Sequence, residues 1–198
     1  MVKIFLIRHG ETTGDVENRY GGDFDDCLSE KGKLQAKALA EKLSGKGIEV
    51  IFHSPRKRAA ETAKVIAAKL NVEMKVVDDL RERNQYGVLT GLVKSEAKAK
   101  FPKEVEKLSK HKYRNFVSGS EDYDFFAKRV IAAFKKISSE DYKKIAIITH
   151  GGPISTLARG LLNLGEFKIL GDCSIMILEA KNGKYLLVSL QGAELEGK

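Results

Sequence analysis

Short runs of apolar, β-prone residues recur along this chain and alternate with segments of helical periodicity, and this pattern constrains the fold more than any other feature. The runs cover residues 2–7, 50–52, 74–77, 145–149 and 173–178, and they are nearly continuously apolar. Between them, apolar residues return at helical spacing, as in Leu34, Ala38, Leu39 and Leu43. Strands without polar alternation are typical of parallel sheets that are covered on both faces. We therefore predict an α/β fold, a three-layer α/β/α sandwich with a mainly parallel sheet.

Two segments depart from this alternation. Near the C-terminus, two apolar runs flank Asn182 and Gly183, a pair suited to a two-residue hairpin turn, which predicts an antiparallel edge strand. Residues 83–121 contain short helical pieces rich in Lys and Ala, so we predict an inserted helical lid there. A length of 198 residues fits a single domain over residues 1–198. Residues 192–198 are polar and are expected to fray.

Positive charge is concentrated in the predicted lid. Lys and Arg number 35 against 27 Asp and Glu, a net charge of +8, and residues 94–114 contribute eight basic and three acidic residues. A solvated, lysine-rich helix surface would account for this segment, as would a positive lid over an anionic site. The excess also raises the hypothesis of a nucleic-acid partner.

The sequence contains no obvious membrane or export segment. The longest apolar runs fall far short of the ~18 residues that span a bilayer, and the apolar stretch at residues 1–7 is short for a signal peptide. We therefore expect no membrane partner and a cytoplasmic location. The two cysteines, Cys27 and Cys173, match no paired spacing for a metal or redox site.

Histidines and arginines follow three of the predicted strands. Arg8 and His9 follow the first strand, His53 and then Arg58 follow the second, and His150 with Gly151 follows the fourth. In an open parallel sheet, ligands bind beyond the carboxyl ends of the strands. Three of the four histidines are therefore predicted to lie at one rim, beside arginines.

Several interpretations of these histidines compete. Each could have only a structural role in its loop. His9, His53 and His150 could together bind a metal ion, but the neighbouring arginines would repel a cation. A nucleic-acid surface would need aromatic residues between the basic ones, and this rim lacks them.

A phosphate pocket makes better use of the residues. Guanidinium groups bind phosphate oxygens bidentately, which suits Arg8 and Arg58, and a neutral imidazole between them can attack phosphorus. Glycine after His9 and after His150 lets the backbone approach the anion closely. Pro153 is a good first residue for a helix whose N-terminal amides would face the same anion. Such a site needs no divalent metal.

Several motifs, in order along most of the chain, resemble the histidine phosphatase superfamily, also called the phosphoglycerate mutase-like family. The segment from Arg8 to Thr12 is similar to the signature of that family, and the other blocks follow in the family order. They are Glu17 to Gly22, Leu28 to Gly32, Ser54-Pro55 with Arg58-Ala59, Leu80 to Arg83 with Tyr86-Gly87, and Thr149 to Gly152.

The resemblance implies a role for each matching residue. His9 would be the nucleophile that forms a phosphohistidine, while Arg8, Arg58 and His150 would line the phosphate pocket. Glu82 would act as general acid and base, which requires a protonated carboxyl, so we predict an environment that raises its pKa. The resemblance also implies substrate contacts from Gly151, Tyr86 and Lys94.

One position departs from the family pattern. The family often has Asn six residues after the nucleophile, where this chain has Asp15. A carboxylate beside a phosphate is unfavourable, so we expect Asp15 to turn away or to pair with Arg19, and we leave it out of the site.

We favour a metal-independent phosphomonoester phosphatase that acts on a small, anionic phosphorylated metabolite. The alternative is a cofactor-dependent phosphoglycerate mutase, primed by 2,3-bisphosphoglycerate, because Tyr86 and Lys94 match that group. Against a mutase, Gln85 is an extra residue, and the paired lid arginines have only Arg114 as a candidate. A phosphoprotein phosphatase or a non-catalytic binding module is less favoured. Nucleic acid is not expected as a partner, and a homodimer is left open.

Overall fold

Six strands form one mixed sheet in the computed structural model, which describes residues 1–110 and 117–197. The first four strands along the chain run parallel, and the last two are antiparallel to their neighbours. The predicted mainly parallel sheet with an antiparallel edge is therefore confirmed. The strands are β1 (Val2–Arg8), β2 (Val50–His53), β3 (Glu73–Val76), β4 (Lys144–Thr149), β5 (Phe167–Lys181) and β6 (Lys184–Leu195), in the spatial order β3-β2-β4-β1-β5-β6.

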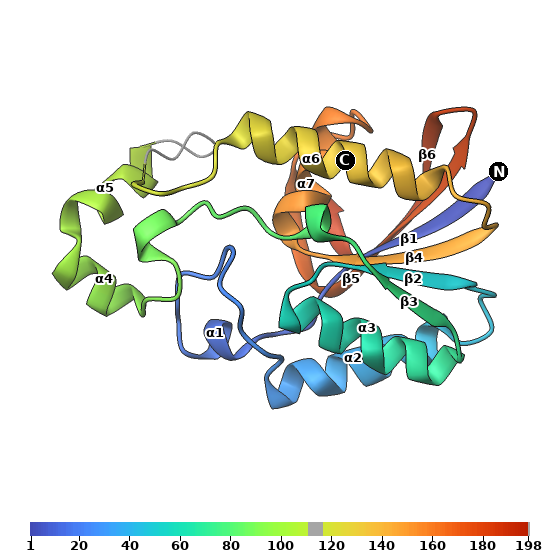
Figure 1. Ribbon diagram of the computed structural model, residues 1–198, viewed down its shortest axis with the longest axis horizontal. Helices are drawn as coiled ribbons and strands as arrows, with labels where there is room; N and C mark the ends of the chain where they lie inside the picture. Colours follow the sequence, from blue (N-terminus) through green and yellow to red (C-terminus); the bar gives the residue numbers. More distant parts are fainter. Residues whose placement is uncertain (111–116, 198) are drawn as a thin grey trace.

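Helices cover both faces of the sheet, as expected for a three-layer sandwich (Figure 1). Helices α2 (Glu30–Leu43) and α3 (Lys57–Leu70) pack on one face, and α6 (Tyr123–Ser138) and α7 (Gly151–Gly160) pack on the other. Strand β1 shows why its sequence lacks alternation. Ile4 and Leu6 join the core under α6, while Phe5 and Ile7 join the core under α2 and α3. Both faces of this strand are therefore buried.

The hairpin between β5 and β6 follows the predicted turn. Asn182 and Gly183 have φ values of 51° and 72°, the left-handed conformation that a two-residue turn of this kind requires. Two boundaries differ from the prediction. Strand β5 begins at Phe167 rather than at residue 173, and β6 continues to Leu195, so residues 192–195 do not fray. Leu195 pairs with Phe167 and is only 4% exposed, so burial of this side chain holds the end of β6 in place.

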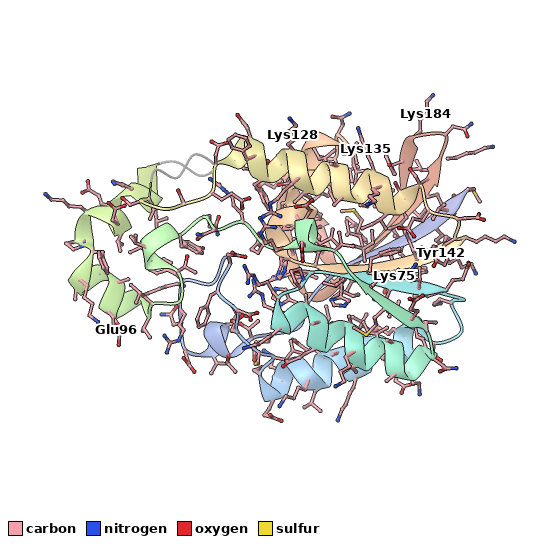
Figure 2. The ribbon with its side chains drawn as sticks, in the orientation of Figure 1. Lys75, Glu96, Lys128, Lys135, Tyr142 and Lys184 are labelled. Carbon is pink, nitrogen blue, oxygen red and sulfur yellow. The ribbon has the colours of Figure 1, made fainter. Side chains whose placement is uncertain are left out.

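At the opposite edge of the sheet, β3 is a short, partly exposed strand that pairs only with β2 in the described residues. Lys75 of β3 donates a hydrogen bond to the hydroxyl of Tyr142 at 2.9 Å, and Figure 2 shows these two side chains together at this edge. A charged side chain on a short edge strand also disfavours pairing with another chain.

Helical segments lie beyond the carboxyl ends of the parallel strands, within the range predicted for the lid (Figure 1). Leu89, Ala97 and Val117 are buried there in a small apolar cluster of their own. Arg114, the candidate lid arginine, lies outside the described residues. No helix in the described parts of the chain is long and apolar enough to cross a membrane. The short elements on this side are α1 (Thr13–Val16), η1 (Asp78–Leu80), η2 (Gly87–Leu89), α4 (Lys94–Lys100) and α5 (Pro102–Lys110).

Candidate active site

The structure brings His9, His150 and Arg58 together at the carboxyl ends of β1 and β4. These strands are neighbours, and Arg8 at the end of β1 is in register with Thr149 at the end of β4. The next residues, His9 and His150, therefore lie side by side, with ring centroids 5.0 Å apart. Arg58, from the first turn of α3, places its Nε 3.1 Å from Nε2 of His9 and 3.2 Å from Nδ1 of His150.

Hydrogen bonding fixes the tautomer of His9. Its Nδ1 lies 2.8 Å from the carbonyl oxygen of Gly10, which can only accept, so Nδ1 carries the proton. Nε2 accepts from Arg58 and therefore holds a lone pair. Burial, together with the Arg58 and Arg8 guanidinium groups, keeps the pKa of His9 well below its usual value. His9 is thus a neutral imidazole whose unprotonated nitrogen faces Arg58.

His150 has the opposite tautomer. Its Nδ1 accepts from Arg58, so Nε2 carries the proton and donates to Oγ of Ser54 at 2.7 Å. His150 and Ser54 are both fully buried. Burial, followed by the charge of Arg58, keeps the pKa of His150 well below its usual value. Ser54 was not predicted as a site residue, although it stands in the Ser-Pro motif that supported the resemblance.

Arg58 is held by a buried carboxylate. Its Nη1 lies 2.8 Å from Oδ1 of Asp26, and both side chains are only 4% exposed. The carbonyl oxygens of Phe24 and Gly22 accept further hydrogen bonds from the same guanidinium. A charge buried this deeply needs such partners. Sequence reasoning missed Asp26 because several acidic residues surround it and nothing in the local pattern distinguishes the buried one.

Arg8 approaches the same place from the end of β1. Its Nη1 donates to the carbonyl oxygen of Leu170, and its Nη2 lies 3.3 Å from Asp172. Its Nε is buried without a hydrogen-bond partner among the described residues. A Cβ atom added to Gly151 would lie 3.9 Å from this Nε, so the unsatisfied N–H is next to the first turn of α7. A buried donor without an acceptor is costly, and a phosphate oxygen would satisfy it.

Glu82 faces this first turn of α7. Its Oε1 accepts from the amide of Arg83 at 2.8 Å, and its Oε2 accepts from the amide of Gly152 at 2.9 Å. Burial raises the pKa of the Glu82 carboxyl, although these two amides and the nearby arginines oppose the shift. The predicted direction is therefore confirmed. A Cβ atom at residue 152 would lie 2.0 Å from Oε1, so this position of the carboxyl requires glycine.

Tyr86 and Lys94 lie on the lid side of the cluster. Tyr86 packs on Tyr20 with ring centroids 5.0 Å apart, and it contacts Gly22, whose carbonyl accepts from Arg58. Lys94 is exposed at the start of α4, with its Nζ 6.0 Å from the ring of Tyr20. Tyr86 thus lies next to Gly22, which binds Arg58. Lys94 lies next to Tyr20, on which Tyr86 packs.

Asp15 turns away from the cluster, which is the first of the two expected outcomes. Its Oδ2 accepts from the amide and the hydroxyl of Thr12 and so caps the short helix α1. The expected alternative, a pair with Arg19, is not what forms, because Arg19 bonds to Glu17 and to the carbonyl of Gly91.

His53 does not join the other two histidines in a metal site. It is buried at the end of β2, with Nδ1 2.8 Å from the carbonyl of Ser54. Across residues 1–110 and 117–197, no group of three or more His, Cys, Asp or Glu side chains is placed to hold a metal ion. The arrangement offers instead a neutral nucleophile, two guanidinium groups and a raised-pKa carboxyl, which together can transfer a phosphoryl group.

Comparison with known proteins points the same way. The sequence profile of the Histidine phosphatase superfamily (branch 1) matches residues 4–192. A metal-independent phosphoserine phosphatase from Arabidopsis thaliana is 30% identical over 193 residues, covering 96% of this chain and 81% of the relative. A 2,3-bisphosphoglycerate-dependent phosphoglycerate mutase from Parvibaculum lavamentivorans is 29% identical over 175 residues, covering 84% and 83%.

A solved structure shares the fold. A phosphoserine phosphatase variant from Entamoeba histolytica, in complex with phosphoserine, is 27% identical and superimposes with a TM-score of 0.75. The alignment covers 96% of each chain. The chain is thus similar in sequence to a phosphatase and to a mutase, and it shares its fold with a phosphatase.

Proposed function

Because the chain belongs to the histidine phosphatase superfamily, we propose that it is a metal-independent phosphomonoesterase that hydrolyses a small, anionic phosphorylated metabolite. The proposed intermediate is a phosphohistidine on Nε2 of His9. Arg8, Arg58 and His150 bind the phosphoryl group, and the amide of Gly151 lies beside it at the start of α7. Two guanidinium groups supply the positive charge that a metal ion supplies in other phosphatases.

In the first step, Nε2 of His9 attacks phosphorus and the P–O bond to the alcohol breaks. Glu82 in its protonated form, which burial favours by raising the pKa of this carboxyl, gives its proton to the departing oxygen. The Nδ1–H bond to Gly10 holds the ring in place while Nε2 forms the new N–P bond. The Arg58 N–H that His9 and His150 now accept is positioned to meet a phosphate oxygen instead.

In the second step, Glu82 is a carboxylate and takes a proton from a water molecule. That water attacks phosphorus, the N–P bond breaks, and inorganic phosphate leaves. Glu82 is protonated again and His9 returns to its neutral form, so the cycle closes without a net change in the enzyme.

The observation that carries this proposal is the neutral His9 ring, with Nε2 directed at the Arg58 guanidinium 3.1 Å away. We expect His9→Ala to abolish phosphate release and to remove acid-labile phosphorylation of the protein. His53→Asn is the matched control, because it changes another buried rim histidine that has no proposed part in the chemistry, and it should retain both signals. Turnover that survives in His9→Ala but is lost on chelation would overturn the proposal in favour of a metal site.

A phosphoglycerate mutase is the second candidate, favoured by the position of Tyr86 next to Gly22 and by the mutase relative. In a mutase, a second hydroxyl of the substrate would attack the phosphohistidine in place of water. Incubation with 3-phosphoglycerate, with and without 2,3-bisphosphoglycerate, separates the two. Isomerisation stimulated by the bisphosphate would establish a mutase, whereas release of inorganic phosphate alone supports hydrolysis.

A phosphoprotein phosphatase and a non-catalytic binding module remain as less favoured functions. A phosphopeptide turned over faster than phosphorylated metabolites would identify the former, and an unaffected His9→Ala variant would identify the latter. The cytoplasmic location and the homodimer stay predictions.

A further inference from the structure

A cavity of about 310 Å³ opens beside Glu82. It lies between the loop that carries Glu82, the first turn of α6, helix α7 and the start of β5. The polar residues in its walls include Glu82, Arg83, Tyr123, Thr156, Arg159 and Glu166. Glu82 is also close to Arg58 and Arg8, the proposed phosphate-binding residues, so the cavity and the proposed reaction centre share this carboxyl.

Charge and aromatic contacts organise the walls of this cavity. The ring of Tyr123 lies close to two guanidinium groups, at 5.5 Å from that of Arg83 and 5.7 Å from that of Arg159. Arg159 also donates to Oε2 of Glu166 at 2.9 Å and to the hydroxyl of Tyr123 at 2.8 Å. These bonds fix the side chain of Arg159 without neutralising the cavity, because two arginines face one ionised glutamate once Glu82 is protonated. With Glu82 in the protonated form that the proposed mechanism requires, the walls carry a net charge of one positive unit.

The chemistry places the alcohol half of the substrate on this side. Glu82 gives its proton to the oxygen that leaves, so the carbon atoms bound to that oxygen have to lie next to Glu82 and away from the phosphate cluster. The volume of about 310 Å³ lies at the lower end of the ~300–1,000 Å³ that small-molecule sites span. A small alcohol fits this space.

We propose that this cavity holds the alcohol half of the substrate and that Arg159 selects alcohols that carry a carboxylate. The inference rests on the proposed phosphatase function. A guanidinium fork matches a carboxylate in shape and charge. The single excess positive charge suits one carboxylate better than a second phosphate group with two negative charges. Arg159 would act as a specificity-determining residue, since it lies beyond the reacting atoms.

The test compares substrates with and without the carboxylate. O-phosphoserine and 3-phosphoglycerate carry it, and glycerol 3-phosphate and phenyl phosphate do not. We expect Arg159→Gln to raise KM at least tenfold for the first two, with kcat little changed, and to alter kcat/KM less than twofold for the others. Arg159→Lys should recover part of the lost affinity, because it keeps the charge but not the fork.

Lys168→Gln is the matched control, since it removes an exposed positive charge two residues from Glu166 but outside the cavity, and it should leave all four substrates unchanged. Equal losses on the four substrates in Arg159→Gln, or no loss on any, would overturn the proposal. Failure of the phosphatase function itself would look different, because the unmodified enzyme would then release no phosphate from any of them.

Discussion

At the scale of single residues, the contact between Glu82 and the first turn of α7 decides whether the carboxyl can serve as a general acid. Oε2 accepts from the amide of Gly152, and the absence of a Cβ atom at that residue leaves room for Oε1. We predict that Gly152→Ala displaces Glu82. An alkyl phosphate, whose alcohol leaves poorly without a proton, should then lose about 100-fold in kcat. Steady-state kinetics would show a much smaller loss for 4-nitrophenyl phosphate, whose leaving group needs no proton.

The control for that substitution lies on the same helix. A Cβ atom at Gly160 would meet only the side-chain end of Ile131, at 3.5 Å. Gly160→Ala should therefore leave both substrates unaffected. Equal losses on the alkyl and aryl esters in Gly152→Ala would show that the substitution disturbs phosphate binding rather than proton donation.

The two buried histidines predict how stability depends on pH. Burial and nearby arginines hold the pKa values of His9 and His150 well below those of the unfolded chain, which are about 6.5. Stability from a lowered pKa is fully present above the unfolded value and is lost as pH falls through it towards the folded value. We expect the free energy of unfolding to drop between pH 7.5 and 5.5, by up to ~1.4 kcal/mol per histidine for each pH unit below 6.5.

Urea denaturation of the protein and of His150→Asn at both pH values would measure this effect. Carboxyl groups also respond to pH, so the difference between the two proteins isolates the histidine contribution. The variant should lose less stability on acidification than the unmodified protein. An identical loss of stability in both proteins would mean that the pKa of His150 is not lowered in the folded protein.

At the scale of elements, the loop after β1 packs closely against the first turn of α2, and Gly32 makes this close contact possible. A Cβ atom at Gly32 would lie 2.0 Å from the carbonyl oxygen of Glu11, a backbone atom that cannot move without the loop that carries His9. Helix propensity alone favours Gly32→Ala by about 1 kcal/mol. We predict the opposite sign, a loss of about 2 kcal/mol of stability by thermal denaturation with a lower kcat. Lys33→Ala is the control, because Lys33 follows Gly32 and its side chain is exposed. It should change stability by less than about 0.5 kcal/mol.

The elements also show how much of the fold the sequence could predict. Strands β1, β2 and β4 are buried on both faces, so their apolar runs mark them directly. The start of β5 gave no such signal, because Lys168, Gly171 and Asp172 interrupt its apolar residues and the pairing with β6 shifts register there. Burial of Leu195 depends on Phe167, a contact between distant positions that no local pattern contains.

The candidate site divides in the same way. His9 and His150 follow strands, so topology alone predicted that they meet. Glu82 stands in a loop with no periodic signal, and only the resemblance indicated it. Asp26 pairs with Arg58, and Arg159 pairs with Glu166. Both partners are more than six positions away in the sequence, so no local pattern predicts these pairs.

At the scale of the whole molecule, the positive charge of the lid side should draw anionic substrates towards the cluster. Helix α4 carries exposed Lys98 and Lys100, and it lies beyond the carboxyl ends of the parallel strands, where Figure 2 labels Glu96. Lys135 and Lys184 lie over α6 and the β5–β6 hairpin, away from α4 (Figure 2). Replacing either pair by Gln changes the net charge equally, from +8 to +6. Any difference between the two variants therefore reports where the charge lies.

We predict that Lys98→Gln with Lys100→Gln raises KM about threefold at low salt for 3-phosphoglycerate, whose carboxylate adds to the charge of its phosphate, because charge around a site raises the encounter rate. Lys135→Gln with Lys184→Gln should have no such effect. The difference should disappear at ~0.5 M salt, where exposed charges are screened beyond a few ångströms. If phenyl phosphate, which carries no charge beyond its phosphate, is affected as strongly as 3-phosphoglycerate, or if the effect persists at high salt, the lysines contact the substrate or shape the lid and do not steer by charge.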